Sequence, residues 1–187
     1  MNRTMHHSLI LCALLVAIAI GHATAGSSAD ALIPFKLKDQ FERLHTDARY
    51  RRSVLVVTWG DRDAKDYLVP WRTALEDSLA PEIQSYRLRT LGVAHTKGVP
   101  FFIKGKLKGV FREQYGWPIL LDWDGDFARA FACTEKTCNL LVFDEKGAFV
   151  QCWSVTDENP DLLTEIVRVV RGLVAAPRGG SGAGATQ

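Results

Sequence analysis

The sequence predicts an α/β fold of three layers, in which a mixed central sheet carries helices on both faces. A continuous apolar and β-branched run at residues 54–59 is typical of a strand that is buried on both faces. Strand-like and helix-like segments alternate after this run, which indicates parallel pairing. Two later apolar runs flank the turn sequence DEKG at residues 144–147, and this pattern predicts an antiparallel hairpin at the edge of the sheet.

The strands can be placed along the chain by their apolar patterns. We expect them at residues 33–40, 54–59, 86–94, 118–122, 139–143 and 148–153. Residues 39–52 are polar and charged, and they are interpreted as a connection between the first two strands.

Apolar residues at helical spacing predict helices at residues 63–79, 99–114 and 126–132, and a last helix that begins after Asn159. Pro70 lies inside the first helix, and Pro81 is expected to end it. Asn159 and Pro160 are a cap residue followed by a proline at the first helical position. The helix at 99–114 is expected to bury an apolar stripe that consists of Phe102, Leu107, Val110 and Phe111.

Length and charge limit the classes of function. The chain has 187 residues, which is enough for one domain with a sizeable core. Its formal net charge is +2, and this near-neutral balance argues against nucleic acid or an anionic membrane as a partner. After residue 25 the only histidines are His45 and His95, and no paired Cys or His spacing is present. We therefore expect no metal site and no cofactor.

Residues 1–25 have the pattern of a secretory signal peptide. Arg3 supplies a positive charge, residues 8–20 are apolar, and Ala23-Thr24-Ala25 offers a cleavage site. The alternative is an uncleaved anchor, but the apolar stretch is short for a membrane span. We expect an exported protein that is not inserted in the membrane after cleavage. Its expected parts are a flexible start at 26–32, one domain at 33–176 and a disordered Gly- and Ala-rich tail at 177–187.

Three stretches resemble proteins of the redoxin branch of the thioredoxin-like superfamily. They are IPFKLKDQFERLHTDARYRRSVLVVTWG, ILLDWDGDFARAF and NLLVFDEKGAFV. The chain is most similar to the periplasmic YtfJ-type proteins, which share the D-Q-F start, a turn without cysteine after the central strand and a hairpin of this kind. The resemblance covers about residues 33–174, and it implies a thioredoxin-like fold and a periplasmic location.

The sequence departs from this superfamily at the redox centre. Thioredoxin-type enzymes carry Cys-x-x-Cys directly after the central strand, and in a gap-free alignment these positions fall on Asp63 and Asp66. The usual cis-proline position falls on Cys138, and Thr58 is followed three residues later by Asp61 where a peroxiredoxin has cysteine. The resemblance therefore implies a degenerate active-site turn that contains Gly60, Asp61, Arg62, Asp63 and Asp66.

The acidic residues of this turn have two interpretations. A carboxylate cluster at a helix start could bind a cation or act as acid and base. The alternative is helix capping, in which one Asp accepts from backbone N–H groups and the others favour the positive end of the helix dipole. Arg62 and Lys65 neutralise the cluster, which favours capping.

Two further charged segments are interpreted structurally. Residues 122–126, DWDGD, resemble a calcium loop, but glycine stands fourth instead of sixth and Cys133 stands at the twelfth position instead of Glu. They are interpreted as a turn and helix cap. A basic run is a candidate anion site, but a solvated helix face is the favoured interpretation. It consists of Lys97, Lys104, Lys106, Lys108 and Arg112.

Cys133, Cys138 and Cys152 remain after cleavage, and in an oxidising compartment two of them can pair. A structural bridge between Cys133 and Cys138 is expected, with Cys152 as the rival partner and free thiols as a further alternative. If thiol catalysis exists, Cys138 with Cys133 is the candidate pair. The cis-proline alignment places Cys138 near Arg62, Lys65 and a helix N-terminus, which lower thiol pKa values. In the hairpin, Cys152 is expected opposite residue 139, on the face away from Cys138.

Two hypotheses for function follow. The favoured one is a non-catalytic binding or interaction module of the cell envelope, which uses the surface above residues 60–66 for a protein or a small ligand. The alternative is a thiol oxidoreductase or peroxidase that works through Cys138 with Cys133 or Cys152. The missing Cys-x-x-Cys pair favours the binding module.

Overall fold

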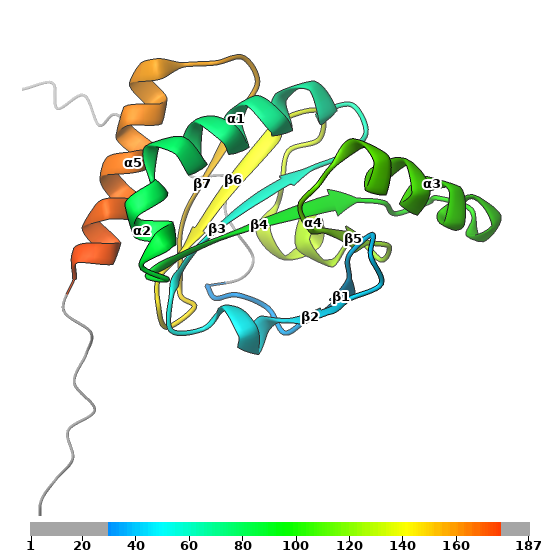
Figure 1. Cartoon of the computed structure of the whole chain (residues 1–187), viewed down its shortest axis with the longest axis horizontal. Helices are drawn as coiled ribbons and strands as arrows, with labels where there is room; N and C mark the ends of the chain where they lie inside the picture. The colour runs from blue at the N-terminus through cyan, green and yellow to red at the C-terminus, as the bar shows by residue number, and fades with distance from the viewer. Residues whose placement is uncertain (1–29, 177–187) are drawn as a thin grey trace, which may run out of the picture.

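The computed structural model describes residues 30–176. Its strands are β1 Lys36–Lys38, β2 Leu44–Thr46, β3 Val54–Gly60, β4 Leu88–His95, β5 Ile119–Asp122, β6 Cys138–Phe143 and β7 Phe149–Val155 (Figure 1). Its helices are α1 Lys65–Ser78, α2 Ala80–Gln84, α3 Phe101–Gln114, α4 Asp126–Phe131 and α5 Pro160–Ala175, with a 3-10 helix at Asp47–Tyr50. The expected signal peptide, residues 26–29 and the expected tail lie outside the described residues. Within residues 30–176, no helix has the length and apolar character needed to cross a membrane.

Five strands form one mixed sheet in the order β5-β4-β3-β6-β7. β4 pairs in parallel with both β3 and β5, whereas β6 is antiparallel to both β3 and β7. The predicted hairpin is therefore confirmed as the antiparallel edge. Its turn is held by Asp144, whose Oδ1 accepts hydrogen bonds from the N–H groups of Lys146 and Ala148, each at 2.8 Å.

Helices cover both faces of the sheet, which confirms the predicted three layers (Figure 1). Side chains of β3 alternate between two cores: Val54 and Val56 pack with α1 and α5, whereas Leu55, Val57 and Trp59 pack with α4. All seven residues of β3 are buried. This double burial explains why its sequence is apolar throughout and does not alternate.

The segment before β3 is more regular than the sequence predicted. The expected strand at 33–40 is reduced to the three residues of β1, and the expected connection at 39–52 supplies β2, which pairs antiparallel with β1. Residues 30–32, expected to belong to a flexible segment, contact the β6–β7 hairpin instead. The physical reason is apolar burial, because Leu32 and Tyr50 both pack into the core on the α4 side.

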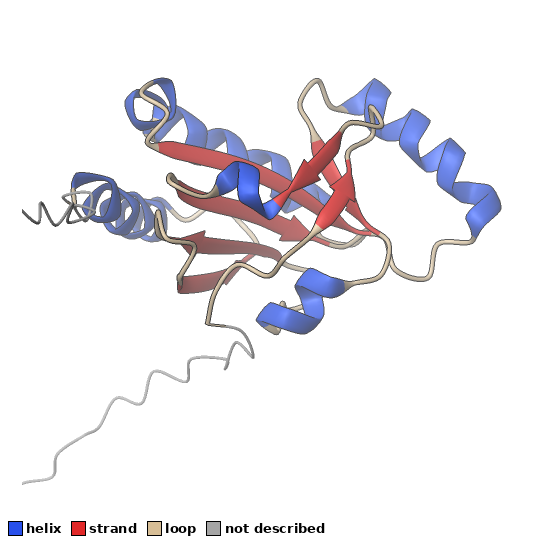
Figure 2. Cartoon of the chain, turned by 90° about the horizontal axis from the view of Figure 1, so that it is seen from below, coloured by secondary structure: helices blue, strands red, loops and turns tan. Residues whose placement is uncertain are grey.

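Two helices differ from their predictions. Pro81 does not end α1; it lies in the first turn of α2, where backbone N–H groups have no helical partner and a proline is tolerated. α3 has nearly its expected span but contains no buried residue. Phe102, expected in a buried stripe, is 70% exposed. Both overall views show α3 extending beyond the edge of the sheet (Figure 2).

The predicted turn and cap at residues 122–126 are confirmed. The carboxylate of Asp122 is fully buried and accepts hydrogen bonds from the N–H groups of Gly125, Asp126 and Phe127 at 3.0, 3.1 and 3.1 Å. Gly125 has a φ of 73°, which only glycine adopts without strain. These bonds fix the start of α4.

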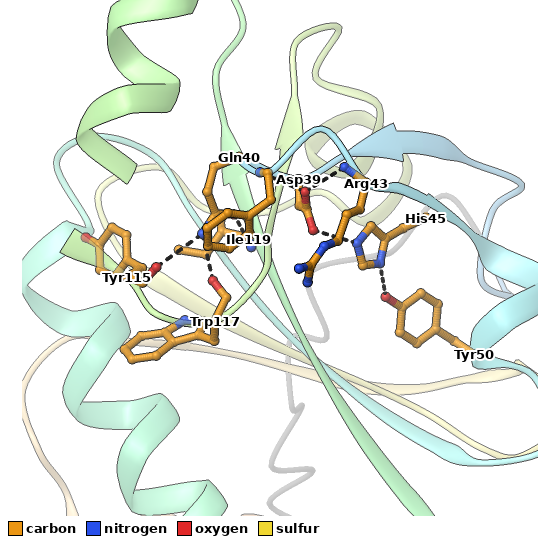
Figure 3. A network of polar contacts seen from close by, with 9 residues as sticks. Asp39, Gln40, Arg43, His45, Tyr50, Tyr115, Trp117 and Ile119 are labelled. Carbon is orange, nitrogen blue, oxygen red and sulfur yellow. Dashed lines mark hydrogen bonds and ion pairs between the residues drawn. The ribbon is translucent and has the colours of Figure 1, made fainter. Parts of the chain in front are cut away.

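The outer side of β5, an edge strand, is closed by Asp39 and Gln40 (Figure 3). The side chain of Gln40 is fully buried, and its Nε2 donates to the carbonyl oxygens of Trp117 at 2.7 Å and Tyr115 at 3.4 Å. Its Oε1 accepts from the N–H of Ile119 at 2.8 Å. One side chain thus satisfies three backbone groups in the connection from α3 to β5.

A buried polar chain holds Gln40 in place (Figure 3). Asp39 Oδ1 accepts from the N–H groups of Phe41 and Arg43, at 2.8 and 2.9 Å. Asp39 Oδ2 lies 3.0 Å from His45 Nε2, and His45 Nδ1 lies 2.7 Å from the hydroxyl of Tyr50. The β1–β2 hairpin and the 3-10 helix are therefore tied to the residue that precedes Gln40.

Gln40→Ala should lower the free energy of unfolding by about 2 kcal/mol, because it removes the partners of the Ile119 N–H and the Trp117 carbonyl. Urea denaturation measures the change. Gln84→Ala, at an exposed position at the end of α2, is the matched control and should change stability by less than about 0.5 kcal/mol. Equal stability of the two variants would contradict the role given to Gln40.

Candidate functional site

In the turn after β3, one carboxylate accepts backbone hydrogen bonds as the capping interpretation expects, but the N-cap of α1 is Ala64 and no side chain caps that helix. Asp61 Oδ1 accepts from the N–H groups of Asp63 and Ala64, both at 3.0 Å. Asp61 Oδ2 accepts from the N–H of Lys136, at 2.9 Å, in the loop before β6. Both carboxylate oxygens of Asp61 are therefore engaged in fixing the turn and the loop that faces it.

The other residues of the turn lie at the surface. Arg62, Asp63 and Asp66 are exposed, and Asp66 forms an ion pair with Lys65 in which the closest atoms are 3.6 Å apart and both side chains are solvated. A Cβ at residue 60 would lie 2.9 Å from Leu68 Cδ1, so glycine permits the close approach of α1 to the end of β3. Among residues 30–176, no group of three or more His, Cys, Asp or Glu side chains is arranged as a metal site.

The three cysteines of residues 30–176 lie on two faces of the sheet. Cys138 is fully buried in the core shared with α1 and α5, whereas Cys133 and Cys152 are half-buried against the core on the α4 side. Cys152 pairs with Leu141 and not with Asn139. Because the shift is two residues, the side chain of Cys152 still lies on the face of the sheet that was expected. All three thiols are free, and a bridge between Cys133 and Cys138 would have to join side chains from opposite faces.

Burial makes these thiols poor acids. It raises the pKa of Cys138 to about 12 and the pKa of Cys152 to about 11, and it also raises the pKa of Cys133. The expected lowering of the Cys138 pKa by Arg62 and Lys65 is wrong, because burial dominates and the nearby Cys152 adds to the increase. The catalytic roles of Cys138 and Cys133 stay predictions, and so does the pairing of the cysteines.

A pocket of about 350 Å³ opens beside the turn, between α1, α3 and the sheet. Its floor is built from small residues of two neighbouring strands. Register pairs Thr58 with Gly92 and Gly60 with Ala94, so these four positions lie side by side and leave space above the sheet. The floor explains why a hollow exists at this place in an otherwise packed fold.

The walls of the pocket are mainly apolar. Leu68 and Val69 come from α1, and Leu107, Val110 and Phe111 come from α3. All of the predicted apolar stripe of α3 except Phe102 therefore faces the pocket and not a core, which accounts for the absence of buried residues in this helix. The connection from α3 to β5 closes the far end of the pocket. Gln40 forms hydrogen bonds with the backbone of this connection.

A few polar groups complete the site. Arg62 and Lys65 lie at the end nearest the turn, and Arg72 lies further along α1 with a side chain that is only 12% exposed. Within residues 30–176, His95 Nδ1 and Thr96 Oγ1 have no hydrogen-bond partner. Sequence reasoning identified the turn but missed Arg72 and the floor. The sequence does contain signals for both. Small residues stand near the ends of β3 and β4, in the patterns Thr-x-Gly and Gly-x-Ala, and Arg72 adjoins the apolar positions of α1.

No protein-family model and no curated protein matches this chain, whereas solved structures do. The exposed lipoprotein thioredoxin of Streptococcus pneumoniae has a TM-score of 0.60 at 14% identity, over 75% of this chain and 100% of that chain. A thiol:disulfide interchange protein of the thioredoxin family from Chlorobium tepidum has a TM-score of 0.54 at 13% identity, over 77% and 95%.

A third structure, the bacterioferritin comigratory protein of Xanthomonas campestris, is described with alkyl peroxide reduction activity. Its TM-score is 0.52 at 16% identity, over 75% of this chain and 92% of that chain. These neighbours carry out thiol or peroxide chemistry, but the present sequence has no Cys-x-x-Cys pair. At such identities the likeness shows the fold alone: the chain has an α/β thioredoxin-like fold.

Proposed function

We propose that this chain is a non-catalytic binding module of the cell envelope, related to the YtfJ-type group, that holds a small apolar molecule in the pocket beside residues 60–66. The pocket itself carries the proposal. Its volume of about 350 Å³ and its apolar walls with few polar groups match the usual properties of small-molecule sites. Export to the periplasm rests on the signal-peptide pattern of residues 1–25.

The contacts of α3 support a pocket that exists before the ligand arrives. Lys108 forms an ion pair with Glu42, and Arg112 Nε donates to the carbonyl oxygen of Gln40 at 2.6 Å. These bonds tie α3 to the N-terminal hairpin on the side away from α1. The helix is thereby held above the floor of small residues, so a ligand would not have to displace packed side chains.

The state of the cysteines argues against the enzymatic alternative. The thiolate is the nucleophile in thiol chemistry, and thiol catalysts lower their cysteine pKa values at helix N-termini or beside cations. Here burial raises the pKa values of all three thiols. The position after the central strand, where the superfamily places its redox pair, contains no cysteine, and its turn is fixed by Asp61.

The thiols should react slowly in the native protein. At about pH 8 a thiol with a pKa near 11 or 12 is almost wholly protonated, so alkylation of Cys152 and Cys138 by iodoacetamide should be at least about a hundredfold slower than in urea. Because a thiol loses its proton as pH rises, the native rate should increase towards pH 11–12. Mass spectrometry counts the labelled thiols. Rapid labelling of Cys138 at neutral pH, or a bridge that mild reductant opens, would favour the enzyme.

The pocket should bind a neutral apolar fluorophore. We expect N-phenyl-1-naphthylamine to give a saturable fluorescence increase with one site per chain. Val110→Phe fills the pocket from α3, so it should abolish this signal and raise the melting temperature of the free protein. Val150→Phe makes the same change at an exposed position of β7 and serves as the control. Failure of the fluorophore to bind, or equal binding by Val110→Phe, would contradict the proposed function.

A further inference from the structure

Arg72 is a largely buried cation on the wall of the pocket. Its side chain is 12% exposed, and its guanidinium carbon lies 5.2 Å from the centre of the Trp117 ring. Nη2 lies 2.7 Å from Glu76 Oε1 and 3.4 Å from Thr90 Oγ1. The guanidinium is therefore fixed on one side by an ion pair and on its face by an indole ring.

The remaining donors of this guanidinium are not used. Nε and Nη1 are buried and have no hydrogen-bond partner within residues 30–176. A guanidinium offers five N–H donors and accepts nothing, so buried unused donors are costly. Burial lowers the pKa of Arg72 and the ion pair with Glu76 opposes this, but an arginine stays protonated at physiological pH.

The floor of the pocket places one of these donors. A Cβ at residue 92 would lie 3.2 Å from Arg72 Nη1 and 3.5 Å from Ile119 Cγ1. Nη1 therefore lies directly above Gly92, which belongs to the floor. Because this distance is shorter than an ordinary Cβ contact, glycine at residue 92 permits the close approach of the guanidinium to the floor.

We propose that the ligand of this pocket is an apolar molecule with one carboxylate, which accepts hydrogen bonds from Arg72 while its hydrocarbon part lies between α1 and α3. This inference rests on the proposed function and adds the chemistry of the ligand. The apolar walls at Val69, Leu107 and Val110 match a hydrocarbon chain, and the unused donors of Arg72 match an anionic oxygen. A carboxylate would satisfy groups that no side chain of the described residues reaches.

The head group of the ligand can be varied at constant chain length. Decanoate should displace N-phenyl-1-naphthylamine at least about tenfold more strongly than decanol, because only decanoate pairs with Arg72. Decyltrimethylammonium should displace it less than decanol, because its cation faces the guanidinium. Equal displacement by decanoate and decanol would overturn the inference.

Two substitutions test the role of Arg72, because one should weaken the binding of decanoate and the other should strengthen it. Arg72→Met should remove the preference for decanoate over decanol and leave decanol binding within about twofold. Glu76→Gln keeps an acceptor oxygen beside Arg72 but removes the competing charge, so it should strengthen decanoate binding several-fold even if Arg72→Met fails to fold. Arg168→Met, on the exposed side of α5, is the matched control and should behave as the unchanged protein.

The outcomes separate this inference from the proposed function. One outcome is that the fluorophore binds and Val110→Phe blocks its binding, but neither the head group of the competitor nor Arg72→Met changes the displacement. In that case the pocket is a binding site and the carboxylate assignment is wrong. If Glu76→Gln leaves decanoate binding unchanged while Arg72→Met folds and binds as Arg168→Met does, the assignment is also wrong. If neither fluorophore nor decanoate binds, the proposed function itself fails.

Discussion

One buried amide supports the far wall of the pocket. β5 is an edge strand, so the backbone groups that lead into it have no neighbouring strand on their outer side. Gln40 supplies their partners, and the chain from Asp39 through His45 to Tyr50 fixes Gln40 from behind. Since α3 ends where this connection begins, the helix is held beyond the sheet edge, above the small residues of β3 and β4, which include Gly92.

The turn after β3 contains no cysteine and is fixed by a carboxylate. Asp61 Oδ1 fixes the turn by accepting from the N–H groups of Asp63 and Ala64, and its Oδ2 accepts from the N–H of Lys136 in the loop before β6. Among the buried side-chain atoms of residues 30–176 that have no hydrogen-bond partner, those of Arg72, His95 and Thr96 belong to residues that line the pocket. Arg72 is the most strongly charged of them, and Glu76 compensates its charge without using all of its donors. The chemistry that we propose for the site is recognition of an anion in apolar surroundings.

The sequence pattern of a single segment predicted those parts of the fold that depend on interactions within that segment. The run at residues 54–59, the hairpin turn at Asp144 and the caps at Asp122 and Asn159 each follow from side chains that act on their own segment. The fold class followed from their order along the chain.

The site depends on contacts that periodicity does not report. The spacing of Leu107, Val110 and Phe111 shows that they share one face of α3, but not that this face meets a hollow. Cysteine spacing likewise does not show that Cys133 and Cys138 lie on opposite faces of the sheet. The hollow requires the small residues of β3 and β4 to be aligned by register, which is a property of the assembled sheet.

The most direct test follows the Arg72 side chain during ligand addition. In nitrogen-15 NMR spectra, the Nε–H resonance of Arg72 can be assigned by comparison with Arg72→Met and followed as decanoate is added. The account predicts a saturable shift of this resonance together with the amides of Gly92 and Ile119, which border the guanidinium. Shifts confined to the exposed Phe101 and Phe102 of α3, with no change at Arg72, would contradict it.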